Sequence, residues 1–234
     1  MRTRGFLLGG TAGRTTLAGE GLQHQDGHSQ LMASVIPNVR AYDPAYAYEV
    51  TVIIQHGLKC MYQNQEDVFY YNTLENENYV QPKMPDSSKY GIIQGMYKLL
   101  EGTQSSSPKV QLLASGALVN EVIEASKLLK LDWNIDSDIW SVTSYSELHR
   151  EAEDKSRWNI LHPEETAKTS YVGSCMQPEN GPVIAISDYV KLVAEQIAPY
   201  IECPFVALGT DGFGRSETRE ELRRFFEVNR YYIV

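Results

Sequence analysis

The feature that most constrains the fold is a regular alternation of short apolar segments with amphipathic helical segments. In two segments, apolar residues recur every three or four positions, which places them on one face of a helix. The first segment has Val50, Ile53, Ile54, Leu58 and Met61 on this face, and the second has Leu118, Val122, Ala125 and Leu129. Strands separated by such helices run parallel, with the helices on the faces of the sheet. The sequence therefore predicts an α/β fold with a mostly parallel sheet. The expected strands are "RGFLLGG", "NVRAYDP", "DVFYYNTL", "KVQLLASG", "IDSDIWSVTS", "PVIAIS", "PFVALG" and the terminal "YYIV". The first, the fourth and the last of these are expected to be buried.

A polar stretch divides the chain into two expected units. "ENENYVQPKMPDSS" contains two prolines and no apolar period, and a Ser-rich turn follows near residue 105. The prediction is a first unit at residues 1–88, a connector at residues 89–108 and a second unit at residues 109–234.

Two helix starts are expected from local sequence. Asp43 followed by Pro44 predicts a helix whose first free amides bond to the Asp43 carboxylate. Thr218 and Glu221 have the spacing of a capping box, which predicts a helix after the glycine-rich "GTDGFGRS".

Composition narrows the class of function. The chain has 42% hydrophobic and 22% charged residues and a formal net charge of −9. An acidic chain lacks the basic face of a nucleic-acid-binding protein, and no apolar stretch has the length of a membrane span. Cys60, Cys175 and Cys203 are far apart and odd in number, which favours a reducing cytoplasm.

The segment "GEGLQHQDGH" holds the densest group of ionisable side chains, namely Glu20, His24, Asp26 and His28. Three interpretations are open: a metal site, a surface turn, and a loop that handles protons. The segment lacks the usual metal-ligand spacings, and glycine with polar residues is common in turns. Its place after a buried parallel strand favours proton handling, since ligands bind beyond the carboxyl ends of such strands.

Other candidates are less specific. "GTDGFGRS" resembles a phosphate cradle at a helix start but lacks the lysine of a phosphate-binding loop, so a tight turn before a capped helix is preferred. His162, in "SRWNILHPEE", is interpreted as a hydrogen-bonded structural residue. Cys175 has no base near it in sequence, so a nucleophile is unsupported.

Several longer strings together resemble one family. "RGFLLGGTAGRTTLAGEGLQHQDGHS", "IPNVRAYDPAYAYEV", "NENYVQPKMP", "RWNILHP" and "LGTDGFGRSETREELRRFFEV" are similar, in this order, to the homodimeric bacterial type of pyruvate dehydrogenase component. This family is the thiamine-diphosphate-dependent decarboxylase of the pyruvate dehydrogenase complex. The resemblance runs from near residue 2 to residue 234.

The resemblance implies the end of a transketolase-like pyrimidine-binding domain, to about residue 88, followed by most of a transketolase-type carboxy-terminal domain. It implies oxidative decarboxylation of pyruvate, with transfer of acetyl to a lipoyl group, by a cytoplasmic homodimer that works with a lipoyl-bearing acetyltransferase. The family's Gly-Asp-Gly and Asn ligands of Mg²⁺ and the diphosphate have no match here, since Thr210-Asp211-Gly212 departs from the pattern. The glutamate that activates the thiamine ring would precede residue 1. All cofactor ligands are therefore expected outside this chain, which alone is expected to be inactive.

Carried over residue by residue, the resemblance assigns catalysis to His24 and Glu20. His24 would donate protons and contact the substrate, since histidine side chains titrate near neutral pH, and Glu20 would orient or stabilise its imidazole. Asp26 and His28 are expected to shape the loop. Two alternatives remain: a non-catalytic remnant or assembly module of the same fold, and a metal-dependent hydrolase.

Overall fold

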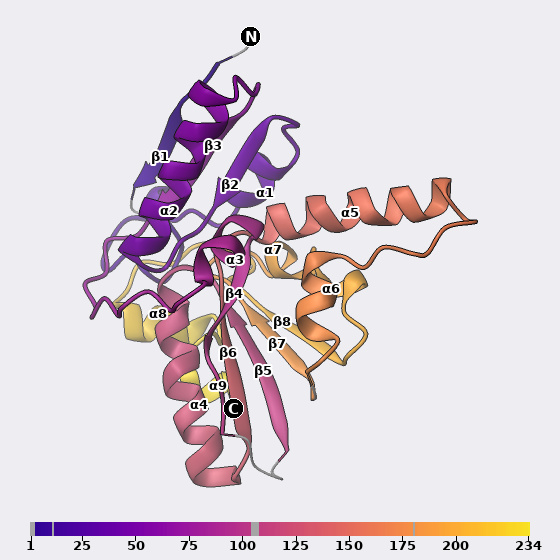
Figure 1. Ribbon diagram of the computed structural model, residues 1–234. Coiled ribbons are helices and arrows are strands. Elements are labelled where there is room, and N and C mark those ends of the chain that lie inside the picture. Colours follow the sequence, from indigo (N-terminus) through magenta and orange to yellow (C-terminus); the bar gives the residue numbers. More distant parts are fainter. Residues whose placement is uncertain (1–2, 11, 104–107, 180) are drawn as a thin grey trace.

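The structure is a computed structural model that describes residues 3–10, 12–103, 108–179 and 181–234. Two sheets organise these residues, one of three strands and one of five (Figure 1). Thr11, in the predicted glycine loop, and residues 104–107, in the predicted connector, lie outside the described residues.

The first sheet has the order β1-β3-β2, and all its strands are parallel. Its strands are β1 (Phe6–Gly10), β2 (Val39–Tyr42) and β3 (Phe69–Leu74). Helix α2 (Ala47–Leu58) continues into a π-helical turn (Lys59–Gln63) and packs on one face, while the short α1 (Ser29–Ser34) packs on the other. The predicted strand, helix and parallel strand from residue 39 to residue 74 are confirmed.

Strand β1 differs from its prediction in one respect. It was expected to be buried, but Leu7 is 58% exposed and Leu8 is 51% exposed. β1 is an edge strand that pairs only with β3 in the described part of the chain, so it is not enclosed by other strands. Its apolar sequence therefore identified the strand but not its position in the sheet.

The second sheet has the order β4-β6-β5-β7-β8. Its strands are β4 (Met96–Leu100), β5 (Lys109–Ala114), β6 (Asp136–Val142), β7 (Val183–Ile186) and β8 (Phe205–Leu208). Only β4 is antiparallel, so the expected mostly parallel sheet is confirmed. Successive side chains point to opposite faces, and Leu112 and Leu113 accordingly join two different core clusters.

Helices cover both faces of this sheet. The face of Leu112 is covered by α4 (Val119–Trp133), α8 (Arg219–Phe225) and α9 (Arg230–Ile233). The face of Leu113 is covered by α5 (Tyr145–Leu161), α6 (Tyr171–Met176) and α7 (Leu192–Glu195). Short 3-10 turns lie at Leu22–His24, Gly116–Leu118 and Ala198–Tyr200. None of the helices in the described ranges combines the length and apolarity that crossing a bilayer requires.

The predicted connector contains regular structure. It includes most of helix α3 (Ser88–Gln94) and all of strand β4, which pairs with β6. The boundaries at residues 88 and 108 stay a prediction, but the sheet pairing joins β4 to the second unit.

The prediction of a final strand at "YYIV" is wrong, because these residues lie in and just after helix α9. The Asn229 side chain accepts hydrogen bonds from the amides of Tyr231 and Tyr232 at 3.0 and 3.3 Å, and Ile233 is buried against the α4 face. A helix cap and one buried side chain therefore decide the local structure against the β propensity of the segment.

Candidate functional site

The residues predicted to be catalytic lie on the loop that follows β1, called here the site loop (residues 12–28). His24 ends the 3-10 turn Leu22–His24, where its amide donates to the Gly21 carbonyl at 3.0 Å, and its side chain is exposed. Glu20 is also exposed. No hydrogen bond or ion pair joins these two described side chains, and both are exposed to solvent.

Asp26 shapes the end of the site loop. Its Oδ1 accepts hydrogen bonds from the amides of His28 and Ser29 at 3.1 and 2.9 Å, and its Oδ2 accepts one from the Ser29 hydroxyl. These amides belong to the start of α1, which would otherwise lack partners. Asp26 is thus occupied locally, whereas His28 is exposed.

A metal centre finds no support in these side chains. Within residues 3–10, 12–103, 108–179 and 181–234, no three His, Cys, Asp or Glu side chains converge as a metal site would require.

The inner part of the site loop is buried against the second unit. The Asp188 carboxylate accepts hydrogen bonds from the amides and the hydroxyls of both Thr15 and Thr16, at 2.7 to 3.1 Å. Arg14, which is 4% exposed, donates to the carbonyls of Thr210 and Gly212. The base of the loop is therefore fixed by residues that follow β7 and β8.

The outer part of the site loop meets a second glycine-rich segment. The Gly19 amide donates to the Glu217 carbonyl at 2.9 Å. The Gln25 Oε1 accepts from the Arg215 amide at 2.6 Å, and the Gln25 Nε2 donates to the Arg215 carbonyl. "GTDGFGRS" thus lies against the predicted catalytic loop, an arrangement that local sequence could not indicate because the partners are about 190 residues apart. Thr218 caps α8 by accepting from the Glu221 amide at 3.3 Å, which is one half of the predicted capping box, while the Glu221 carboxylate bonds to Arg224 instead.

Three buried carboxylates gather where the two sheets meet, and local sequence rules missed their role. Asp43 was expected to cap a helix, but α2 begins only at Ala47. Instead, Asp43 accepts hydrogen bonds from the hydroxyls of Thr73 at 2.6 Å and Ser115 at 2.7 Å, so it joins the first unit to the second. Burial raises the pKa of Asp43 to about 6, although these hydrogen bonds oppose the rise.

Glu75 and Asp188 complete this acidic cluster. Burial raises the pKa of Glu75 well above its ordinary value, and the nearby carboxylates of Asp43 and Asp188 raise it further. Burial also raises the pKa of Asp188, against the hydrogen bonds from Thr15. The Glu75 Oε2 accepts from the Ala117 amide, while its buried Oε1 has no hydrogen-bond partner. Burial at the junction of the two units therefore raises the pKa of all three carboxyl groups.

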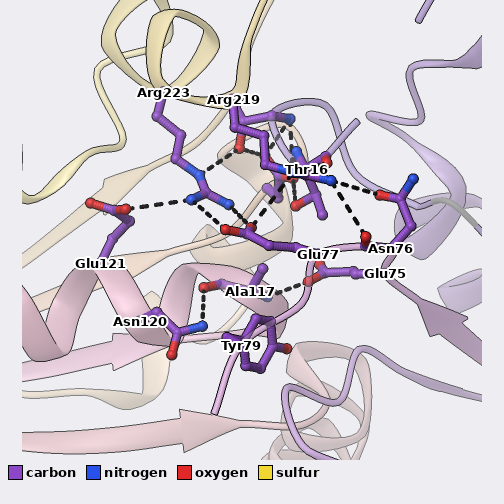
Figure 2. Close-up of polar contacts among 12 residues, drawn as sticks. Thr16, Glu75, Asn76, Glu77, Tyr79, Ala117, Asn120, Glu121, Arg219 and Arg223 are labelled. Carbon is purple, nitrogen blue, oxygen red and sulfur yellow. Dashed lines mark hydrogen bonds and ion pairs between the residues drawn. The ribbon is translucent and has the colours of Figure 1, made fainter. Parts of the chain in front are cut away.

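A charged network beside this cluster also spans the two units (Figure 2). Arg223, which is 6% exposed, lies between Glu77 from the first unit and Glu121 on α4, with its Nη1 at 3.3 and 3.4 Å from their respective Oε1 atoms. One turn earlier on α8, Arg219 donates to the Thr16 carbonyl at 2.6 Å and to Asn76. Helix α8 is thus bonded both to the site loop and to the segment after β3.

Asp43 gives a test of this junction that depends on pH. Unfolded aspartate loses its proton near pH 3.8 and Asp43 in the folded chain near pH 6, so folding takes up a proton between these values. The free energy of unfolding should therefore fall as the pH rises through this window, by about 3 kcal/mol for a shift of about two pKa units. Urea unfolding of the wild type and Asp43→Asn from pH 4 to pH 7 measures this term as the difference between the two curves. Parallel curves would contradict it.

The remaining sequence candidates lie apart from the site loop. The His162 ring stacks on Trp158 with centroids 4.4 Å apart, and its Nδ1 lies 2.8 Å from the Trp158 carbonyl, so it helps to order the end of α5. Burial raises the pKa of the Cys175 thiol, which disfavours a nucleophilic thiolate. A cavity of about 280 Å³ lies between α2, β3 and α5, and neither His24 nor Glu20 lines it.

Comparisons with known proteins match the chain in two parts. The family model of the pyruvate dehydrogenase E1 component middle domain matches residues 1–82. The model of the transketolase-like C-terminal domain matches residues 95–229.

Similar proteins extend this result over the whole chain. It is 55% identical to a pyruvate dehydrogenase E1 component of Cupriavidus necator and 56% identical to one of Pseudomonas aeruginosa, each over 100% of this chain. In both cases the chain spans only 26% of the relative's length. A transketolase variant from Pichia stipitis has the same fold, with a TM-score of 0.68 and 16% identity over 97% of this chain and 29% of that chain.

Proposed function

The chain belongs to the transketolase-like proteins and is homologous to part of the bacterial pyruvate dehydrogenase E1 components, and we propose that it supplies the proton-handling loop of such an enzyme. The observation that carries the proposal is about 55% identity along all 234 residues. A match of this length includes the site loop and the residues after β7 and β8 that bond to it. The complete reaction would be the oxidative decarboxylation of pyruvate, with transfer of acetyl to a lipoyl group.

The cofactors of that reaction would be thiamine diphosphate and Mg²⁺, held by parts of the enzyme outside these residues. This proposal assigns no contact with either group to this chain. Bound thiamine diphosphate supplies the nucleophilic carbon that such an enzyme needs, while the protein orients substrate and moves protons.

His24 and Glu20 would carry this chain's share of the chemistry. The exposed His24 imidazole can reach a substrate held by another part of the enzyme, donating a proton to the carbonyl oxygen of pyruvate and later to the sulfur of the lipoyl group. Glu20 has no described partner that neutralises it, so its carboxylate can turn toward a protonated imidazole and stabilise it. In this proposal Asp26 and His28 bind no substrate.

The proposed partners follow from the same homology. They are pyruvate, the lipoyl-bearing acetyltransferase component and a second E1 chain, in the cytoplasm. The acidic composition gives no reason to add nucleic acid or a membrane.

The proposal can be tested in a chimera in which these 234 residues replace the matching quarter of the Pseudomonas aeruginosa E1 component. We expect the chimera, reconstituted with its acetyltransferase, to oxidise pyruvate at a rate within about tenfold of the parent enzyme. The isolated chain should neither release carbon dioxide from pyruvate nor bind thiamine diphosphate with micromolar affinity. A folded, dimeric chimera that binds cofactor but lacks activity would instead support a non-catalytic assembly module.

A further inference from the structure

The part of the site loop that carries His24 is attached to the rest of the protein at two places. Gly19 bonds to the Glu217 carbonyl, and Gln25 bonds to both the amide and the carbonyl of Arg215. Both attachments end on one short stretch of the second unit, called here the anchor segment (residues 214–217). His24 therefore lies in a short part of the site loop whose two ends, Gly19 and Gln25, are both bonded to the anchor segment.

Between these attachments, residues 20–24 make only local hydrogen bonds with other residues that the structure describes. The amides of His24 and Gln25 donate to the carbonyls of Gly21 and Leu22, which closes the 3-10 turn. Leu22, Gln23 and His24 are all exposed, and no described contact joins their side chains to the body of the protein. The direction in which the turn presents the imidazole is consequently set by its ends.

The residues just before the anchor segment are held in place. Arg14 donates to the carbonyls of Thr210 and Gly212, and the Thr210 amide donates to the Tyr189 carbonyl at 2.8 Å. Gly214 allows the close approach of Gln25, because a Cβ at this position would lie 2.5 Å from the Gln25 Oε1. The anchor segment therefore follows directly on residues that are bonded to the site loop and to the turn after β7, and its Gly214 leaves room for the Gln25 side chain.

We propose that Gln25 is a positioning residue for His24, and that the second unit serves the reaction by setting the position of that imidazole through the anchor segment. This inference rests on the proposed function of His24. A neutral amide suits the task, because only a side chain with both an acceptor and a donor can bond to the Arg215 amide and carbonyl together.

The chimera provides the kinetic test. Gln25→Ala should lower kcat for pyruvate by about 10- to 100-fold, the scale expected when a reacting group is displaced by about 1 Å, with KM for thiamine diphosphate unchanged. Gln25→Glu retains the acceptor for the Arg215 amide but loses the donor to the Arg215 carbonyl, so it should recover only part of this loss. Gln23→Ala is the matched control, since Gln23 lies on the same turn, is exposed and makes no described hydrogen bond, and it should leave kcat within twofold.

A second readout does not depend on catalysis. In the same chimera, hydrogen exchange at the amides of residues 21–26 should be at least tenfold faster in Gln25→Ala than in Gln23→Ala, with the melting temperature within about 2 °C of the parent. The two assays separate this inference from the function on which it rests. A large loss in His24→Ala together with wild-type kcat and exchange in Gln25→Ala would overturn the positioning role alone. Wild-type activity in His24→Ala with fast exchange in Gln25→Ala would refute the catalytic proposal while showing that Gln25 orders the turn.

Discussion

His24→Ala in the chimera should lower the rate of pyruvate oxidation by about 100-fold, the usual scale for losing a positioned proton donor. The imidazole is exposed, so its removal leaves no cavity and no buried polar group unpaired. The loss should therefore appear in kcat, with the melting temperature and the affinity for thiamine diphosphate unchanged. Steady-state assay with the acetyltransferase, alongside a thermal melt and a cofactor titration, measures all three quantities.

His28→Ala is the matched control for this prediction. His28 is a second exposed histidine on the site loop, but it adjoins the helix start that Asp26 stabilises, and we assign it no chemistry. Its replacement should change kcat by less than threefold. Equal losses in the two variants, or a His24→Ala enzyme impaired only in cofactor binding, would contradict the assignment.

Arg223→Met should destabilise the chain by about 3–5 kcal/mol, the range found when one member of a buried ion pair is removed. Arg223 is 6% exposed and bonds to Glu77 of the first unit as well as to Glu121 of the second. Glu121 retains Arg230, at 3.0 Å, but Glu77 then keeps only a distant contact with Arg219, at 4.0 Å. The Glu77 carboxylate is thus left without its close partner at the junction of the units. Chemical denaturation at pH 7 gives the difference in the free energy of unfolding.

Arg224 provides a control for the Arg223→Met variant. Arg224 lies next to Arg223 on α8, but its side chain is 68% exposed and, among the residues that the structure describes, pairs only with Glu221. Arg224→Met should cost far less stability than Arg223→Met, because an exposed ion pair is screened by solvent. A second variant, Arg223→Met with Glu77→Gln, should recover part of the lost stability by removing the unpaired charge. Similar losses in the two single arginine variants would show that Arg223 does not join the units.

The spacing of apolar residues predicted the buried face correctly where that face depends on residues within one helix or strand. Leu118, Val122, Ala125 and Leu129 all lie in the core face that their spacing predicts. The strands from Val39 to Tyr42 and from Phe69 to Leu74 were likewise identified from their apolar runs. These features depend on neighbours a few residues away, which a single sequence displays directly.

Features that depend on distant partners could not be read in this way. Asp43 obeys the local rule for a helix cap, but its carboxylate bonds to Thr73 and Ser115, which are 30 and 72 residues away. Likewise, the pairing of Gln25 with Arg215 spans 190 residues, and neither residue alone suggests the other. The resemblance to a family located His24, but the support beneath it required the three-dimensional structure.

The long separation of these partners also has a consequence for how the chain acquires its active form. Arg14 bonds to carbonyls 196 and 198 residues later, so this loop cannot reach its final conformation until nearly the whole segment has left the ribosome. Contacts between residues so far apart in sequence form late and slowly, because the entropy of closing a large loop must be overcome first. Strands and helices of each unit can form earlier from local interactions. A nascent chain halted before residue 210 would therefore contain most of the fold while His24 remained on an unanchored loop.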